Sequence, residues 1–460
     1  MLVNKKSVEN IIQKSLEYGA DFCDVFVEKN NSQIISYNES KVKNIESGID
    51  FGIGIRLIYG TQALYGYTNS SEEKDLLALV EKLASQYKFA QKIMSPIAFK
   101  EIPYQAIQAF KDKDVSLKER IEILAKLDKL TRARSEYIHQ VNLMMLQKTQ
   151  MVEIYDSEGL AMKETRPYTR LVSNALAKDG DKRSSGGWNP GSRGGFEFFE
   201  GLDLNWISEH ISAKAMTTLK TKPCPAGKMP VVIDNGFGGV IFHEACGHLL
   251  ETTSVEKKAS VFWDKKNELI AHEALNAIDD GTIDNLWGSL SIDDEGMPTQ
   301  KTVLIKNGRL ENFLSDRLGE LKTGHKRTGS ARRQSYRFAP ASRMRNTFIG
   351  KGEHSLDDLL QSMGDGLYAK SMGGGSVNPG TGEFNFAVEE GYLVKNGKIQ
   401  EAVKGATLIG RGEEIMKKIS MVSKDLEFSA GMCGSVSGSI PVTVGQPAVK
   451  VDEILVGGQA

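Results

Sequence analysis

The motif His243-Glu244-x-x-x-His248 restricts the local structure of this chain more than any other feature of the sequence. Its two histidines are five residues apart. In the commoner HExxH motif the histidines lie about 40° apart around an α-helix and share one zinc ion, with Glu as general base. A spacing of five separates the rings by about 140° on a regular helix. A π-bulge, which Gly247 would ease, would bring them together again. The motif therefore predicts either a bulged helix with a metal ion or a regular helix without one.

A catalytic zinc site needs a third protein ligand and an open position for water. Cys433 lies among small residues in FSAGMCGSVSG, which suits a ligand loop, although an isolated cysteine is more often a small buried hydrophobe. Cys246, three residues after His243, is a rival ligand that would more often pack in the core. Glu251, three residues after His248, is a candidate ligand or a group that orients that histidine, although a glutamate at a helix end is more often simply exposed. From the residues alone, the third ligand stays open.

Composition argues against several classes of protein. Lys and Arg (58) nearly balance Asp and Glu (59), and the net charge of -1 gives no field that would attract nucleic acid. The four cysteines lie far apart in 460 residues, which indicates a reducing, cytoplasmic setting instead of a disulfide framework. The sequence has no run of eighteen apolar residues and no apolar signal segment at its start, so we expect neither a membrane span nor export.

Hydrophobic periodicity predicts an α+β fold. Helices are expected over about 7–18 and 204–219, and after two capping-box pairs, Ser70 with Glu73 and Ser116 with Glu119. Short strands are expected at 22–28, 33–37, 52–59 and 63–68, and further strands within 138–178. The Gly-rich segment 184–195 is expected to be a loop.

The chain is expected to form two major domains. Two prolines and a glycine in TKPCPAG, residues 221–227, interrupt regular structure and mark the boundary. The N-terminal domain, residues 1–222, should mix sheet and helices and can be divided into subdomains of about 1–95 and 110–222. The C-terminal domain, residues 223–460, should be dominated by antiparallel β-sheet and carry the HExxxH helix.

Three further segments of the C-terminal half are informative. Asn-Gly pairs in VLIKNGRLENFL (303–314) and YLVKNGKIQEAV (392–403) predict two hairpins with two-residue turns. The acidic segment IDDEG (292–296) is more typical of a turn than of a metal site. In the basic stretch KTGHKRTGSARRQSYR, Arg332 or Arg333 is a candidate to pair with a peptide carboxylate, although a solvated loop or a subunit contact is equally plausible.

The motifs and their order resemble the TldD/PmbA metallopeptidase family, whose members are also labelled modulators of DNA gyrase. The similarity covers most of residues 225–460, and in the N-terminal half it is weaker but present in ADFCDVFVE and GIGIRLIYG. The segments that carry it in the C-terminal half are HEACGHLLE, GSLSIDDEGMPTQ, VLIKNGRLENFL, TGSARRQSY, MGGGSVNPGTGEF, VKGATLIGRG and MCGSVSGSIPVTVGQPAVKVDEILVGG.

The resemblance implies a zinc peptidase that holds one Zn²⁺ per chain through His243, His248 and Cys433, with Glu244 as general base; it suggests no role for Cys246. Zinc would polarise the scissile carbonyl and acidify water, whose proton Glu244 would pass to the leaving amine. The resemblance also implies action in the cytosol on unfolded or short peptides. Because the chain keeps every motif residue, it resembles the active TldD-type partner, which forms a homodimer or a heterodimer with a PmbA/TldE-type paralogue.

Two alternatives stay open at this point. One is a non-catalytic peptide-binding or scaffold subunit of a TldD/PmbA-type complex; Glu244 argues against it, because a structural metal site has no use for a general base beside its ligands. The other is a regulator that binds DNA or gyrase, and a salt-dependent affinity for DNA would favour it.

Overall fold

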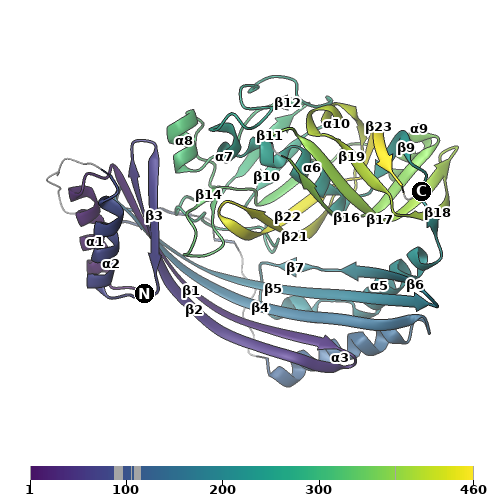
Figure 1. Ribbon diagram of the computed structural model, residues 1–460, viewed down its shortest axis with the longest axis horizontal. Coiled ribbons are helices and arrows are strands. Elements are labelled where there is room, and N and C mark those ends of the chain that lie inside the picture. The colour runs from purple at the N-terminus through teal and green to yellow at the C-terminus, as the bar shows by residue number, and fades with distance from the viewer. Residues whose placement is uncertain (1, 88–96, 105, 108–114, 379, 459–460) are drawn as a thin grey trace.

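The computed structural model describes residues 2–87, 97–104, 106–107, 115–378 and 380–458. Helices and largely antiparallel sheets confirm the α+β fold expected from the sequence. Figure 1 shows an elongated molecule in which a long curved sheet from the N-terminal half extends beneath the C-terminal half. Among the helices of the described ranges, none is long and apolar enough to cross a lipid bilayer.

The N-terminal sheet consists of antiparallel strands in the order β3-β2-β1-β4-β5-β6, with β7 paired to β5. The strands are β1 (Phe22–Asn38), β2 (Lys41–Tyr59), β3 (Gln62–Thr68), β4 (Ile138–Asp156), β5 (Ala161–Asp179), β6 (Lys182–Trp188) and β7 (Gly191–Ser192). The four short strands expected before residue 68 are parts of three longer ones, because polar residues between them continue the pairing. Asn30 of β1, for example, lies opposite Asp50 of β2.

The Gly-rich segment 184–195 is not a simple loop, so that expectation was wrong. Much of it belongs to β6 and β7. A Cβ on Gly186 would overlap the carbonyl oxygen of Ile211 in α5 (Leu204–Leu219). The glycine therefore allows the edge strand to lie directly against a helix, which periodicity of apolar residues does not reveal.

Helices cover the two ends of this sheet. They are α1 (Lys5–Glu17) and α2 (Glu73–Ala84) at one end, and α3 (Leu117–Arg132), the short α4 (Glu197–Glu200) and α5 at the other. The capping box of α3 forms as predicted between Ser116 and Glu119. The one predicted for α2 does not form, because Ser70 donates to Asp75 at 2.6 Å and the Glu73 carboxylate is bound by side chains of α1.

Alternation along β1 gives the sheet two different faces. Val25 and Val27 pack with the helices α1 and α2. Phe26, on the other face, packs with Ile292 and Tyr336 of the C-terminal half. The inner face of the sheet is thus an interface between the two halves of the chain.

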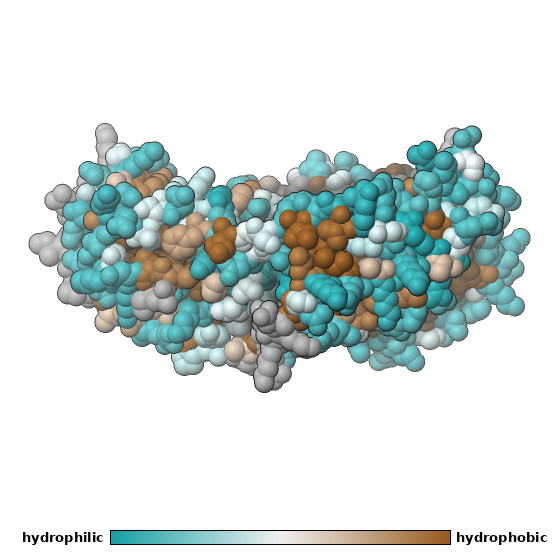
Figure 2. Space-filling view, turned by 90° about the horizontal axis from the view of Figure 1, so that it is seen from below, coloured by the Kyte–Doolittle hydropathy of each residue, from teal (hydrophilic) through white to brown (hydrophobic). Residues whose placement is uncertain are grey.

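The outer surface on the sheet side is largely polar. Figure 2 shows this side from below, with hydrophilic residues over most of it and apolar residues gathered near the middle of its length. Ile45 and Ile49 of β2 are among the exposed apolar residues of the sheet.

The C-terminal half contains a six-stranded sheet, an eight-stranded sheet and a two-stranded ribbon. The six-stranded sheet has the order β12-β11-β10-β15-β22-β21, and β15 and β22 are parallel. In the larger sheet, β16, β9, β23, β19 and β17 pair in turn and β17 pairs again with β16, so five strands form a closed ring. β18 and β8 extend the sheet from β17, and β20 pairs with β23.

The strands of this half are β8 (Lys222–Pro223), β9 (Gly227–Ile233), β10 (Ala277–Asp280), β11 (Lys301–Lys306), β12 (Arg309–Leu310), β13 (Ala331–Arg332), β14 (Ala341–Ser342), β15 (Asn346–Ile349), β16 (Gly366–Val377), β17 (Glu383–Lys395), β18 (Lys398–Lys404), β19 (Thr407–Arg411), β20 (Ile419–Val422), β21 (Glu427–Ser435), β22 (Gly438–Gln446) and β23 (Val449–Gly457). Both Asn-Gly hairpins form. Asn307 and Gly308 have φ of 47° and 75°, and Asn396 and Gly397 have φ of 49° and 71°, the positive values that a type I′ turn needs.

One helix of this half lies in the core between the two large sheets. It is α6 (Val240–Ala245), whose Ile241 and Phe242 are fully buried. The other helical segments are η1 (Gly236–Gly239), η2 (Gly247–Leu250), α7 (Thr252–Val255), α8 (Arg317–Thr323), α9 (Leu356–Met363) and α10 (Gly412–Lys418). The surrounding sheets thereby fix the position of the HExxxH segment.

Candidate metal centre

His243 and His248 lie on two consecutive short helices, α6 and η2. Between them Cys246, with φ of -135° and ψ of -47°, leaves the α-helical region. Its N–H donates to the Phe242 carbonyl at 3.0 Å, in the α-helical pattern, whereas the Leu249 N–H donates to the Cys246 carbonyl at 2.9 Å, in the 3₁₀ pattern. A break followed by a tighter helix accommodates the spacing of five, so both forms that the motif predicted, a π-bulged helix and a regular helix, were wrong.

Gly247 has a packing role at this break. A Cβ there would overlap the Met344 sulfur, and Met344 is fully buried. The glycine lets the second helix lie close to that side chain, instead of easing a bulge as the sequence suggested.

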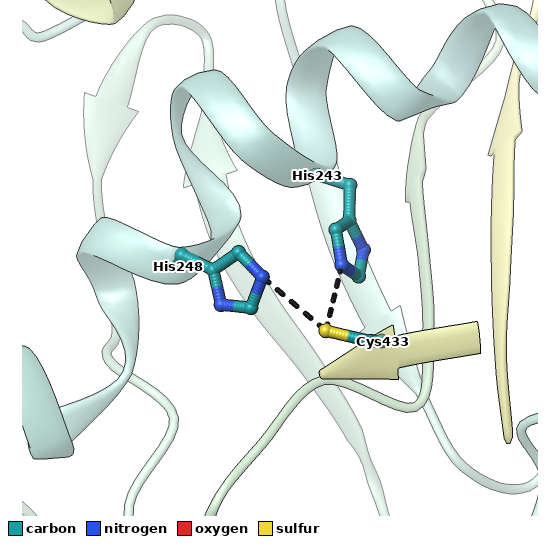
Figure 3. Close-up of side chains that lie close together, drawn as sticks. All are labelled: His243, His248 and Cys433. Atoms are coloured by element: carbon teal, nitrogen blue, oxygen red, sulfur yellow. Dashed lines mark hydrogen bonds between the residues drawn. The ribbon is translucent and has the colours of Figure 1, made fainter. Parts of the chain in front are cut away.

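Three donor atoms converge beside the break, from His243, His248 and Cys433 (Figure 3). The Cys433 Sγ lies 3.3 Å from the Nε2 of each histidine, and the two rings are nearly perpendicular. Two tetrahedral zinc ligands, at about 2.0 Å for nitrogen and about 2.3 Å for sulfur, lie about 3.5 Å apart. The spacing and the chemistry of this donor set fit a zinc ion.

The charge state of Cys433 also suits a metal ligand. Burial alone would raise the pKa of its thiol, but the neighbouring His243 and His248 lower it to about 3. The thiolate is the form that binds zinc. Cys246 lies in the apolar core, where burial raises its thiol pKa, so it stays protonated. The structure thus brings Cys433, and not Cys246, to the two histidines.

Glu251 orients His248. Its carboxylate is 2% exposed, lies 3.0 Å from His248 Nδ1 and also accepts the Met344 N–H at 3.2 Å. Burial opposes a charge on His248, but the Glu251 carboxylate and the Cys433 thiolate raise its pKa well above the ordinary value. A metal ion would take the place of the proton on Nε2, while the carboxylate that accepts the Nδ1 proton holds the ring in place.

Arg343 holds the strand that carries Cys433. Its Nη2 donates to the Cys433 carbonyl at 2.6 Å, and its Nη1 donates to Ser437 Oγ at 2.9 Å and to the Gly438 carbonyl at 3.0 Å, at the turn between β21 and β22. Sequence analysis missed Arg343. No motif marks it, and its role depends on contact with a residue 90 positions away.

Glu244 lies at the edge of the donor cluster. Its Oε2 is 3.7 Å from His248 Nε2, and its side chain is 22% exposed. A carboxylate that is close to the ligand atoms and reached by water can exchange a proton with a water molecule at the site.

Arg332 and Arg333 are buried and lie at the interface between the two halves, next to the hairpin of β21 and β22. Arg333 makes contacts within the protein. Its Nη2 donates to the Asp294 carbonyl at 2.9 Å, and its guanidinium lies 4.2 Å from the Phe26 ring centroid. Arg332 donates through Nη1 to the Met344 carbonyl at 2.9 Å. Neither side chain belongs to a solvated loop.

Comparison with known proteins identifies similar sequences over almost the whole chain. Family models match the PmbA/TldA metallopeptidase domain 1 at residues 23–86, the central domain at 110–219 and the C-terminal domain at 226–458. A "Metalloprotease TldD homolog" from Haemophilus influenzae is 35% identical, over 99% of this chain and 97% of its own. A "Zinc metalloprotease TldD homolog" from Saccharolobus solfataricus is 28% identical, over 97% of this chain and 99% of its own.

Solved structures share the fold. A putative modulator of a DNA gyrase from Thermotoga maritima superposes with a TM-score of 0.80 at 20% identity, covering 98% of this chain and 100% of that one. TldE from Thermococcus kodakarensis superposes with a TM-score of 0.78 at 20% identity, again covering 98% and 100%. At this level of identity the likeness concerns the fold alone.

Proposed function

Since the chain belongs to the PmbA/TldD metallopeptidase family, we propose that it is a zinc-dependent peptidase with one zinc ion per chain, held by His243, His248 and Cys433. The observation that carries this proposal is the convergence of two imidazole Nε2 atoms and a thiolate beside Glu244. A His₂Cys set leaves a fourth tetrahedral position open, as catalytic zinc sites do.

The residues around the site have distinct parts in the proposed hydrolysis. Zinc, when bound, supplies Lewis-acid chemistry that polarises the scissile carbonyl and acidifies water. Glu251 keeps the His248 ring oriented through Nδ1. Glu244 accepts the proton of the attacking water and delivers it to the leaving amine. The Cys433 thiolate offsets one positive charge of the metal, so the site is a weaker Lewis acid than one with three neutral histidines.

We propose unfolded or short peptides of the cytosol as substrates. The likeness to a TldE structure supports a heterodimer with a PmbA/TldE-type paralogue, with a homodimer as the alternative. The net charge of -1 makes nucleic acid a poor partner.

The substitution Glu244→Gln tests the function. It should retain one zinc per chain and lower the rate of peptide cleavage by about 100-fold or more, because it removes the general base and keeps the ligands. Elemental analysis and a digest of a mixture of unfolded peptides, followed by mass spectrometry, measure both quantities. The exposed Glu401→Gln is the matched control and should behave as wild type.

Two other results would count against the proposal. Bound zinc without cleavage in the wild type would favour the non-catalytic peptide-binding subunit. A wild-type protein that holds no zinc even after remetallation would contradict the metal site itself.

A further inference from the structure

A cavity of about 410 Å³ lies between the inner face of the N-terminal sheet and the hairpin of β21 and β22. Met432 and Pro441 of the hairpin line this cavity, whereas Cys433 and Ile440 pack together on the hairpin's other face. Because side chains alternate along a strand, the hairpin separates the cavity from the donor cluster. The cavity is therefore a second site, distinct from the metal centre.

Among the described residues, three cationic side chains of this cavity form no ion pair with a carboxylate. Arg332, Arg170 and Lys148 line it, and among the described residues no carboxylate oxygen lies within 4.0 Å of their charged nitrogens. Arg332 is 3% exposed, and burial lowers the pKa of its guanidinium to about 10. Burial also lowers the pKa of Arg170, whose Nε is buried without a hydrogen-bond partner. Such groups gain free energy when an anion binds beside them.

The acid in the cavity wall, Asp294, raises the pKa of the Arg332 guanidinium through its charge, but it forms its hydrogen bonds with other groups. Asp294 Oδ1 accepts from Arg166 Nη1 at 2.6 Å, and its Oδ2 accepts the Arg333 backbone N–H at 2.7 Å. Both carboxylate oxygens are therefore occupied by other donors.

The rest of the wall is mostly apolar. Trp287, Leu146, Leu290 and Met432 are among its apolar side chains, and the Arg170 guanidinium lies 5.5 Å from the Trp287 ring centroid. Cavities of this volume hold small organic ligands. Cations set among apolar walls suit an anion with an apolar body better than a hydrated inorganic ion.

We propose that this cavity binds the C-terminal residue of a peptide whose last side chain is apolar, with its carboxylate facing Arg332 and Arg170. The identity of the ligand rests on the proposed peptidase function, because the free carboxyl end of a peptide is an anion that a peptidase meets and produces at every turnover. The apolar side chain would lie against Trp287.

Isothermal titration calorimetry on the zinc-loaded Glu244→Gln protein tests the proposal without turnover. The probes are N-acetyl-leucine, its amide and inorganic phosphate. N-acetyl-leucine should bind, and both the uncharged amide and phosphate should bind at least tenfold more weakly. Equal binding of the acid and the amide, or of the acid and phosphate, would overturn the proposal.

Substitutions in the same background identify the site. Arg332→Met should weaken binding of N-acetyl-leucine by about tenfold or more, which separates the cavity from any carboxylate binding at zinc. Its thermal midpoint should change little, because the substitution removes a buried charge that has no ion pair but also removes the hydrogen bond to the Met344 carbonyl. The control Arg411→Met changes an exposed arginine outside this cavity and should leave the affinity unchanged.

Arg170→Met gives a second route if Arg332→Met does not fold, with the same expected loss of affinity. An affinity that neither substitution changes would contradict the cavity site. The test distinguishes this inference from the proposed function. If the wild type cleaves peptides but the cavity binds no carboxylate, only the inference is contradicted. If the cavity binds the carboxylate but the protein has no peptidase activity, only the proposed function is contradicted.

Discussion

At the scale of single residues, two buried cysteines show that neighbouring side chains determine whether a thiol is ionised. Cys433 and Cys246 are 5% and 0% exposed, so burial does not distinguish them. Cys433 lies between two imidazoles that stabilise its thiolate, whereas Cys246 lies among apolar side chains that disfavour one. From the residues alone both were candidate ligands, and the family resemblance favoured Cys433. Only tertiary contact between residues 190 positions apart brings Cys433 to His243.

Serine substitutions at the two cysteines test this difference. Cys433→Ser should lose most of the bound zinc, because a serine hydroxyl does not provide an anionic ligand at neutral pH, and Cys246→Ser should keep one zinc per chain. Elemental analysis of proteins purified without chelator measures the zinc content, and circular dichroism checks that both variants fold. Loss of zinc from Cys246→Ser alone would show that the ligand set is wrong.

At the scale of elements, close contact between two short helices positions the HExxxH segment. Gly412 begins α10, and a Cβ there would overlap the carbonyl oxygen of Ala245, the last residue of α6. A backbone atom cannot move aside as a flexible side chain does. The two helices approach each other in this way only because residue 412 is glycine.

Gly412→Ala should therefore lower the free energy of unfolding by about 2–3 kcal/mol and reduce zinc binding by moving the end of α6. Urea denaturation and zinc analysis measure the two effects. Gly374→Ala is the control, because a Cβ at Gly374 meets no heavy atom within 4 Å. Equal stability of the two variants would show that α6 adapts to the added methyl group.

At the scale of the whole molecule, buried ion pairs join the two halves of the chain. Arg56 of β2 donates to Asp24 and to Glu295, and Arg166 of β5 donates to Glu164 and to Asp294. The acidic segment 292–296 does form the expected turn, with Gly296 at φ of 77°. Its acids are nevertheless buried: Asp294 and Glu295 meet arginines of the sheet, and Asp293 accepts backbone N–H groups.

The pairing of Glu164 predicts a dependence of stability on pH. Burial would raise the pKa of this carboxyl, but Arg166 and Arg193 hold it at about 2, below the ordinary value of 4.5. Because the folded-state pKa is the lower one, the stabilisation is present above about pH 4.5 and is lost as the pH falls toward 2. Its size is about 3 kcal/mol.

Glu164→Gln should be less stable than the wild type at pH 7, and the difference should shrink as the pH falls from 4.5 to 2. Urea denaturation over that range measures it, with the exposed Glu401→Gln as control. A difference that is constant with pH would show that Glu164 does not titrate in this way.

The sequence by itself determined the features that depend on near neighbours in the chain. The helix expected at 204–219 has those bounds in the structure, and the Asn-Gly turns and the Ser116 cap form because their geometry involves only a few adjacent residues. Ser70 shows the limit of such local signals, since side chains of α1 occupy the glutamate of its expected cap. The HExxxH motif and the resemblance of the chain to a family could likewise be recognised from the sequence.

The tertiary structure alone decided how distant residues meet. It determined the break at Cys246 that brings His248 toward His243, the contact of Arg343 with the Cys433 strand, and the burial of Arg332 without a carboxylate. Each of these depends on packing between segments far apart in the chain, and a sequence pattern records the residues that can take part but not the distances between them.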